Sequence, residues 1–180
     1  MTNTGEEIVA AYLECIEQCE FIQKNLYTPD VQGEIDVVGI NLNKKRIYAC
    51  EVAIHLITGL QYTKNNQPNN VDKLVEKFSK DIDYIKKYFP ESEYEQHFML
   101  WSPIVRDPRP GAKHNQMRDI SEIVETIKMN YNVKLEVVIN NDFNTYLNKL
   151  REYAKGETKN LQSPILRYLQ IEEYLKKQIK

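Results

Sequence analysis

Two acidic residues on neighbouring predicted strands offer the clearest chemistry in this sequence. Residues 32–39 and 47–53 are rich in β-branched residues, and the polar turn 41–45 between them predicts a β-hairpin. Side chains alternate between the two faces of a strand, so Asp36 and Glu51 each occupy a defined face among apolar neighbours. A carboxylate in such surroundings needs a cation or hydrogen-bond donors. The hairpin therefore predicts a divalent-metal site made of Asp36 and Glu51.

A plainer interpretation stays open for the same two residues. In an antiparallel pair that is covered on one side only, charged side chains on the wet face are ordinary. Asp36 and Glu51 would then be solvated and would hold no metal. The rest of the chain must decide between these interpretations.

The elements that position the hairpin follow from hydrophobic spacing. Apolar residues recur at intervals of three and four in the predicted helices, and the segment 58–70 between hairpin and second helix predicts a mobile polar loop. In order, we expect a helix over 5–24, an extended edge piece over 26–31, the hairpin, a helix over 71–89 capped by Asn70, a strand over 97–105, a helix near 120–130, a strand over 133–139, and helices near 143–154 and 164–180. This order predicts an α/β fold with a central mixed sheet and helices on both faces.

Composition narrows the class of protein. The 180 residues predict a single domain over 1–180, and a net charge of −2 confines any nucleic-acid surface to a local basic patch. No apolar run approaches the roughly 18 residues that cross a bilayer, and the N-terminus lacks the form of a secretion signal. Three cysteines, an odd number, favour reduced thiols. We therefore expect a cytoplasmic protein with no membrane contact.

The most basic irregular stretch, 106–118, follows the predicted strand 97–105. Arginine and lysine bind phosphates, and side-chain amides can pair with adenine, so this loop predicts a DNA-binding segment; a plain connecting loop is the alternative. The nucleic-acid-binding residues that we expect in it are Arg106, Arg109, Lys113, His114, Asn115, Gln116 and Arg118.

Three motifs together resemble the PD-(D/E)xK nuclease superfamily, especially its restriction-endonuclease-like and Holliday-junction-resolvase-like members. They are Gly-Glu-Glu-Ile-Val-Ala-Ala-Tyr-Leu at 5–13, Gly-Glu-Ile-Asp at 33–36, and Glu-Val at 51–52. The resemblance implies a restriction-endonuclease-like core, αβββαβ, followed here by a C-terminal αβαα. It also implies a DNA endonuclease that uses Mg²⁺ or Mn²⁺. Residue by residue, it assigns Glu6 as an outer carboxylate, Asp36 as the principal metal ligand, Glu51 as the second ligand, and the carbonyl of Val52 as a further ligand.

The chain departs from this family at Ala53, where the family's motif has a lysine that polarises the attacking water. His55 lies on the same predicted face but about 6–7 Å further along the strand, too far for direct replacement. Members of the family can supply this cation from a neighbouring element, and Lys77, or else Lys73, on the following helix is then the candidate. His55 would be a proton-handling group or simply a packed strand-end histidine.

The missing lysine also leaves two other classes of function open. One is a catalytically impaired relative that binds DNA without cutting it. The other is an interaction subunit that binds a partner or forms a homodimer, for which the apolar residues of 161–180 offer a surface.

Overall fold

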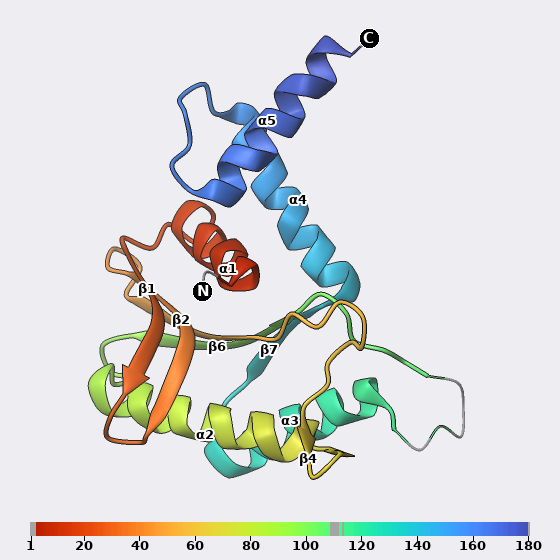
Figure 1. The fold of residues 1–180 in the computed structure, drawn as a ribbon. Coiled ribbons are helices and arrows are strands. Elements are labelled where there is room, and N and C mark those ends of the chain that lie inside the picture. The colour runs from red at the N-terminus through yellow and green to blue at the C-terminus, as the bar shows by residue number, and fades with distance from the viewer. Residues whose placement is uncertain (1–2, 109–111, 113, 180) are drawn as a thin grey trace.

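The computed structural model describes residues 3–108, 112 and 114–179, and shows an α/β fold built on a five-stranded mixed sheet (Figure 1). The strands are β1 (Phe21–Thr28), β2 (Gly33–Asn41), β3 (Arg46–Val52), β6 (Glu95–Ser102) and β7 (Leu135–Ile139). They lie in the order β1-β2-β3-β6-β7, with antiparallel pairing up to β3 and parallel pairing from β3 to β7. The predicted mixed sheet and the predicted hairpin β2–β3 are confirmed.

Helices cover both faces of this sheet, as the sequence predicted (Figure 1). One face carries α1 (Thr4–Cys15) and α4 (Asn140–Gly156), with α5 (Pro164–Gln178) packed against both helices. The other face carries α2 (Asn70–Tyr88) and α3 (Gln116–Tyr131). Each face therefore encloses its own hydrophobic cluster.

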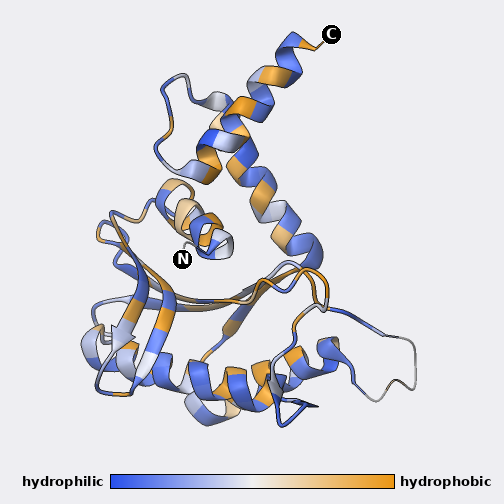
Figure 2. Cartoon of the chain, viewed as in Figure 1, coloured by the Kyte–Doolittle hydropathy of each residue, from blue (hydrophilic) through white to orange (hydrophobic). Residues whose placement is uncertain are grey.

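The helix α2 shows how sequence spacing fixes one of these clusters. Leu74, Phe78, Ile82 and Ile85 follow one another at intervals of three and four, and all four are buried against the sheet. Burying one such side chain contributes about 1.5–3 kcal/mol, so this stripe holds α2 firmly beside β2 and β3. Figure 2 shows the same alternation of hydrophobic and hydrophilic residues along the helices.

The first helix is shorter than the predicted 5–24. It ends at Cys15, and Gln18 adopts a left-handed backbone conformation with φ of 60°. A non-glycine residue in that conformation cannot continue a right-handed helix. The chain then enters β1 at Phe21, five residues before the predicted extended piece, and β1 lies at the sheet edge.

The predicted loop 58–70 contains a small hairpin of its own. Strands β4 (Thr63–Lys64) and β5 (Gln67–Pro68) pair around Asn65 and Asn66, which both have positive φ. Asparagine tolerates that conformation, which explains the tight turn. The sequence predicted a loop here and missed these two short strands.

Asn70 does not cap α2 as predicted but is the first residue of the helix. Its buried side chain accepts a hydrogen bond from the Tyr62 amide at 2.7 Å and donates one to Asp119 Oδ2 at 2.8 Å. It therefore joins the 58–70 segment to α2 and α3. None of the described helices is long and apolar enough to cross a membrane.

A buried cluster of carboxylates and a lysine

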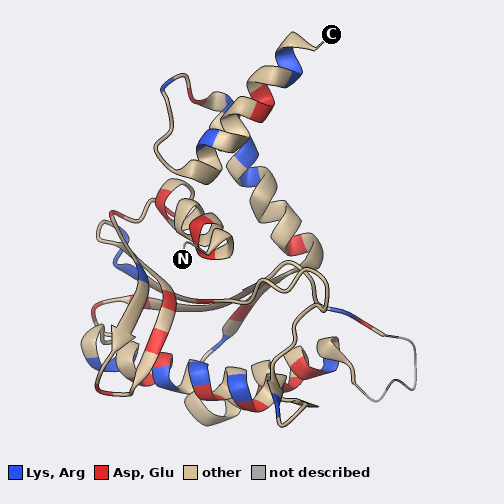
Figure 3. Cartoon of the chain, viewed as in Figure 1, with Lys and Arg blue, Asp and Glu red and all other residues tan. Residues whose placement is uncertain are grey.

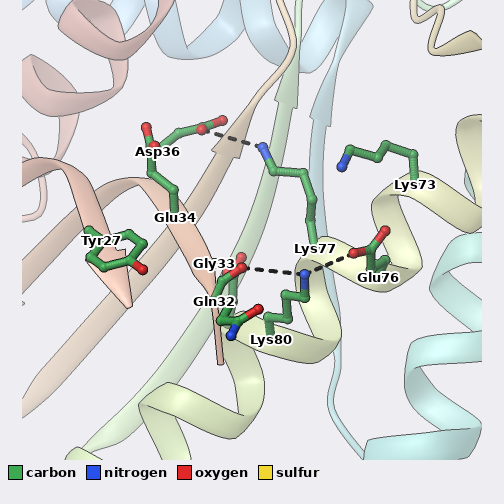
Figure 4. A pocket seen from close by; sticks show the side chains of 10 residues that line it. Tyr27, Gln32, Gly33, Glu34, Asp36, Lys73, Glu76, Lys77 and Lys80 are labelled. Carbon is green, nitrogen blue, oxygen red and sulfur yellow. Dashed lines mark hydrogen bonds and ion pairs between the residues drawn. The ribbon is translucent and has the colours of Figure 1, made fainter. Parts of the chain in front are cut away.

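Asp36 and Glu51 lie side by side on the face of the sheet that α2 covers. The register pairs Val37 with Cys50, which puts Asp36 opposite Glu51 on the neighbouring strand. The ammonium of Lys77 on α2 forms an ion pair with Glu51 Oε2. It forms a second one, at 3.4 Å, with Asp36 Oδ1 (Figure 4). The structure thus brings together three of the predicted catalytic residues.

A further carboxylate, Asp81, stands one turn after Lys77 on the same helix. The side chains of Asp81 and Glu51 are each only 1% exposed. Glu51 Oε1 and Asp81 Oδ2 have no hydrogen-bond donor among the described residues. Buried oxygens in this state are costly, and two neighbouring carboxyls relieve the cost by sharing a proton. This proton is one that a bound cation could replace.

The ionisation of the cluster follows from its burial. Burial raises the pKa of Glu51 well above its usual range, and the charges of Asp81 and Asp36 raise it further. Burial likewise raises the pKa of Asp81 to about 7. For Lys77, burial lowers the pKa, but the carboxylates of Glu51 and Asp36 outweigh burial and raise it overall. Lys77 is therefore a permanent cation at neutral pH.

Val52 contacts this cluster through its amide. The Val52 N–H donates a hydrogen bond of 2.7 Å to Asp36 Oδ2, which fixes the orientation of that carboxylate. The predicted role of the Val52 carbonyl as a metal ligand stays a prediction. Ala53 is buried and donates its N–H to the Trp101 carbonyl at 2.8 Å.

Glu6 lies at the start of α1 and is held by two amides. Its oxygens accept hydrogen bonds from Asn3 at 2.7 Å and from Asn25 at 3.0 Å. Asn25 stands opposite Asp36 in the β1–β2 register, so Glu6 reaches the strand next to Asp36. Within the described part of the chain no hydrogen bond or ion pair joins Glu6 to Asp36 or Lys77.

A pocket of about 460 Å³ opens beside the cluster, between the hairpin of β1 and β2 and the helix α2 (Figure 4). Lys73, the second predicted cation, lines this pocket together with Lys80. The residues that line it are Tyr27, Gln32, Gly33, Glu34, Asp36, Lys73, Glu76, Lys77, Lys80 and Asp81. The structure therefore favours Lys77 over Lys73 as the cation that contacts the strand carboxylates.

His55 lies past the end of β3 and stacks edge-on against Tyr62, with ring centroids 5.7 Å apart. Burial raises the pKa of Tyr62; the charge of Lys77 lowers it, and the carboxylates of Glu51 and Asp36 raise it. His55 thus adjoins the cluster through Tyr62.

The amides of the predicted DNA-binding loop are used within the protein. Asn115 caps α3 by accepting the Arg118 N–H at 3.0 Å. Gln116 accepts the Arg106 N–H at 2.8 Å and donates to the Thr58 carbonyl at 3.0 Å. These bonds brace the loop, so base contacts by either amide would have to break them.

The structure describes only some of the other predicted DNA-binding residues of this loop. His114 and Arg118 line a second pocket at the start of α2, which also contains Asp72 and Asp119. Arg109 and Lys113 lie outside the described residues. Figure 3 shows that basic residues also follow one another along α2, intermixed with acidic ones. The surface of α2 next to the strand carboxylates therefore carries charges of both signs.

Sequence reasoning missed Asp81 and Tyr62. Asp81 stands in the apolar stripe of α2, three residues after Phe78 and four before Ile85. A charged residue at a position where the helix is otherwise apolar is a signal of a buried site. Tyr62 carried no such signal because its segment was predicted to be a loop.

Comparisons of the chain with protein-family models, with curated proteins and with solved structures found no significant match.

Proposed function

We propose that this protein is a metal-dependent DNA endonuclease of the PD-(D/E)xK type in which Lys77 replaces the missing motif lysine. The observation that carries the proposal is the ammonium of Lys77, which contacts both Asp36 and Glu51 from a neighbouring helix. Apart from the small separate hairpin of β4 and β5, the element order from α1 through β6 agrees with the αβββαβ core that the sequence resemblance implies.

The carboxylates suit a magnesium-like cation. Glu51 Oε1 and Asp81 Oδ2 are buried oxygens without donors, and carboxylate oxygens are the ligands that Mg²⁺ prefers. No group of three metal-ligating side chains is preassembled in the described part of the chain. Mg²⁺ does not require one, because it commonly binds one or two carboxylates and completes its shell with water and substrate phosphate.

In this proposal Asp36 and Glu51, with the Val52 carbonyl, would hold Mg²⁺ or Mn²⁺. Bound there, the ion would lower the pKa of a water and neutralise charge on the scissile phosphate. The Val52 N–H keeps Asp36 in a fixed orientation. Lys77 has a raised pKa, so it acts as a fixed positive charge that stabilises developing negative charge and not as a base.

A second candidate function is a catalytically impaired protein of the same fold that binds DNA or a partner. Lys77 already neutralises the two strand carboxylates, and Ala53 removes the usual lysine. The exposed apolar residues Tyr168, Ile171 and Leu175 on α5 offer a surface for a partner or a second copy. These observations favour the impaired form if no turnover is found.

The test is cleavage of supercoiled, linear and branched DNA with Mg²⁺ or Mn²⁺. We expect wild type to cut at least one substrate, and Asp36→Ala and Lys77→Ala to lose at least about 100-fold in rate. Lys155→Ala, which alters an exposed lysine on α4, is the matched control and should cut normally. Failure to cut any substrate would reject the nuclease in favour of the second candidate. Full activity in Asp36→Ala would reject Asp36 as the metal ligand.

A further inference from the structure

Tyr27 is an exposed aromatic residue that forms part of the pocket wall. Its side chain is 64% exposed, and it lies on β1 opposite Glu34 of β2. Figure 4 shows Tyr27 on one side of the pocket and Lys73 and Lys80 on the other, on α2. A single exposed tyrosine is ordinary on a protein surface. This one differs because it faces two lysines across a pocket that also contains Asp36 and Lys77.

Two lysines of α2 hold the turn between β1 and β2 in place. The Gln32 carbonyl accepts a hydrogen bond from Lys80 at 3.4 Å, and Asp30 forms an ion pair with Lys87 at 2.7 Å. At Gly33, an added Cβ would lie 2.9 Å from Thr28 Oγ1 and 3.4 Å from Lys80 Cβ, so glycine lets the turn approach α2 closely. These contacts fix the distance between the β1–β2 turn and α2, so the pocket between Tyr27 and α2 has a defined shape.

The lysines of the pocket differ in how strongly they are engaged. Lys80 pairs with Glu76 at 2.8 Å, but this pair is exposed and therefore weak, so a phosphate could displace Glu76. Among the described residues, the ion pairs within the pocket use Lys77 and Lys80 and leave Lys73 without a carboxylate partner. Lys73 and Lys80 are thus accessible to an anion.

The lysines alone do not make this pocket a strong binding site for anions. Glu34 and Glu76 also line it, so charge alone would bind a phosphate weakly. Stacking on an aromatic ring adds binding that does not depend on charge, and every nucleobase has a face that can stack. At about 460 Å³ the pocket has the size of small-molecule sites, which suits one nucleotide. A base that is unpaired can turn its face to Tyr27, whereas a base stacked within a duplex cannot.

We propose that this pocket binds one nucleotide of an unpaired DNA strand, with Tyr27 stacked on its base and Lys73 and Lys80 on the flanking phosphates. The inference rests on the proposed function and adds the substrate class to it. Because the same pocket contains Asp36 and Lys77, the nucleotide it holds adjoins the bond that is cut. Single-stranded or locally unpaired DNA is then preferred over intact duplex.

The test measures DNA binding by fluorescence anisotropy. A labelled oligothymidylate of twelve nucleotides and a labelled duplex are each titrated with protein in a buffer that contains Ca²⁺. We expect wild type to bind the single strand more tightly than the duplex. Tyr27→Ala should weaken single-strand binding about 5- to 140-fold, and Tyr27→Phe should retain it. Tyr168→Ala removes a tyrosine that is 65% exposed on α5, and this matched control should bind as wild type does.

The lysines give a second readout in the same assay. Lys73→Ala and Lys80→Ala should each weaken binding of the single strand and reduce the slope of log K against log salt concentration by about 0.7. A thermal melt of each variant establishes that it folds. Equal single-strand affinity in Tyr27→Ala and Tyr168→Ala, a preference for duplex, or absence of DNA binding would overturn the nucleotide pocket.

This test separates the inference from the nuclease itself. Metal-dependent DNA cleavage together with unchanged single-strand binding in Tyr27→Ala would overturn the nucleotide pocket and leave the nuclease intact. Tyr27-dependent binding of the single strand without any metal-dependent cleavage would overturn the nuclease and support the pocket.

Discussion

Glu51 on strand β3 and Glu17, which contacts Tyr48 of the same strand, lie on opposite faces of the sheet, and their carboxylates have different partners. On the α1 face, Glu17 accepts hydrogen bonds from the hydroxyls of Tyr12 and Tyr48, each at 2.9 Å. On the α2 face, Glu51 is completely buried, and its Oε1 has no donor among the described residues. The same strand therefore supports one satisfied carboxylate and one that depends on Lys77.

The difference teaches which of the two carboxylates belongs to a site. Burial, and then the charge of Glu17, raises the pKa of Tyr12; burial and the hydrogen bond to Glu17 raise that of Tyr48, so both hydroxyls stay protonated as donors. That arrangement adds stability and leaves no unused oxygen. Burying the charged groups around Glu51 instead lowers the free energy of unfolding, and such costly arrangements are typical of functional sites. Breaking each arrangement should have distinct consequences.

The largest effect on stability should come from removing the cation of the Glu51 cluster. Lys77→Met leaves Glu51 and Asp36 without a positive charge, and breaking a buried ion pair in this way costs about 3–5 kcal/mol. Urea unfolding at pH 7 measures the loss. Lys155→Met, on an exposed pair, should change stability by at most about 1 kcal/mol. An equal effect in both variants would remove the distinction between a lysine paired with a buried carboxylate and a surface lysine.

Asp81→Asn should have the next largest effect, and its sign depends on pH. The pKa of Asp81 is raised from 3.8 to about 7, so the folded protein binds a proton that the unfolded chain releases above pH 3.8. Its contribution to stability is present at low pH and is lost as the pH rises through 7, by at most about 4 kcal/mol. Asp81→Asn should therefore gain stability relative to wild type at pH 8, with a flatter profile.

Urea unfolding between pH 4 and pH 9 in EDTA checks this prediction. Asp83→Asn changes an exposed carboxylate on the same helix and should follow the wild-type profile. If the stability of Asp81→Asn changes with pH as that of wild type does, then Asp81 does not hold a proton in the folded protein at neutral pH, and this prediction is wrong.

A smaller effect is expected on the α1 face. Tyr48→Phe removes one of the two hydrogen bonds to Glu17 and should cost about 1 kcal/mol, because the other hydroxyl and solvent still serve the half-exposed carboxylate. DNA cleavage by Tyr48→Phe should equal that of wild type. A loss of cleavage without a loss of stability would show that the two faces are not independent.

The sequence predicted the parts of the fold that local patterns determine. Strand pairing in β2 and β3 followed from β-branched residues around a polar turn, and the apolar stripe of α2 followed from helical spacing. The end of α1 was missed because the left-handed backbone at Gln18 has no marker such as glycine or proline.

The sequence predicted those residues of the site that follow from strand alternation or from the family resemblance. Asp36 and Glu51 share a face by strand alternation, and Lys77 was proposed because α2 had to pack on this sheet. The partnership of Asp81 with Glu51 depends on how deeply α2 packs, which is a tertiary property. The hydrogen bonds that occupy Asn115 and Gln116 likewise depend on contacts with segments distant in the sequence.

The measurement that tests the central claim most directly is Mn²⁺ binding, followed by the electron paramagnetic resonance signal of the free ion, in wild type, Glu51→Gln and Glu17→Gln. Glutamine keeps the size of the side chain and removes its charge in both variants. We predict that wild type and Glu17→Gln bind Mn²⁺ alike, and that Glu51→Gln loses at least about 10-fold in affinity. Equal affinity in the two variants, or no Mn²⁺ binding by wild type, would contradict a metal site on the α2 face of β3.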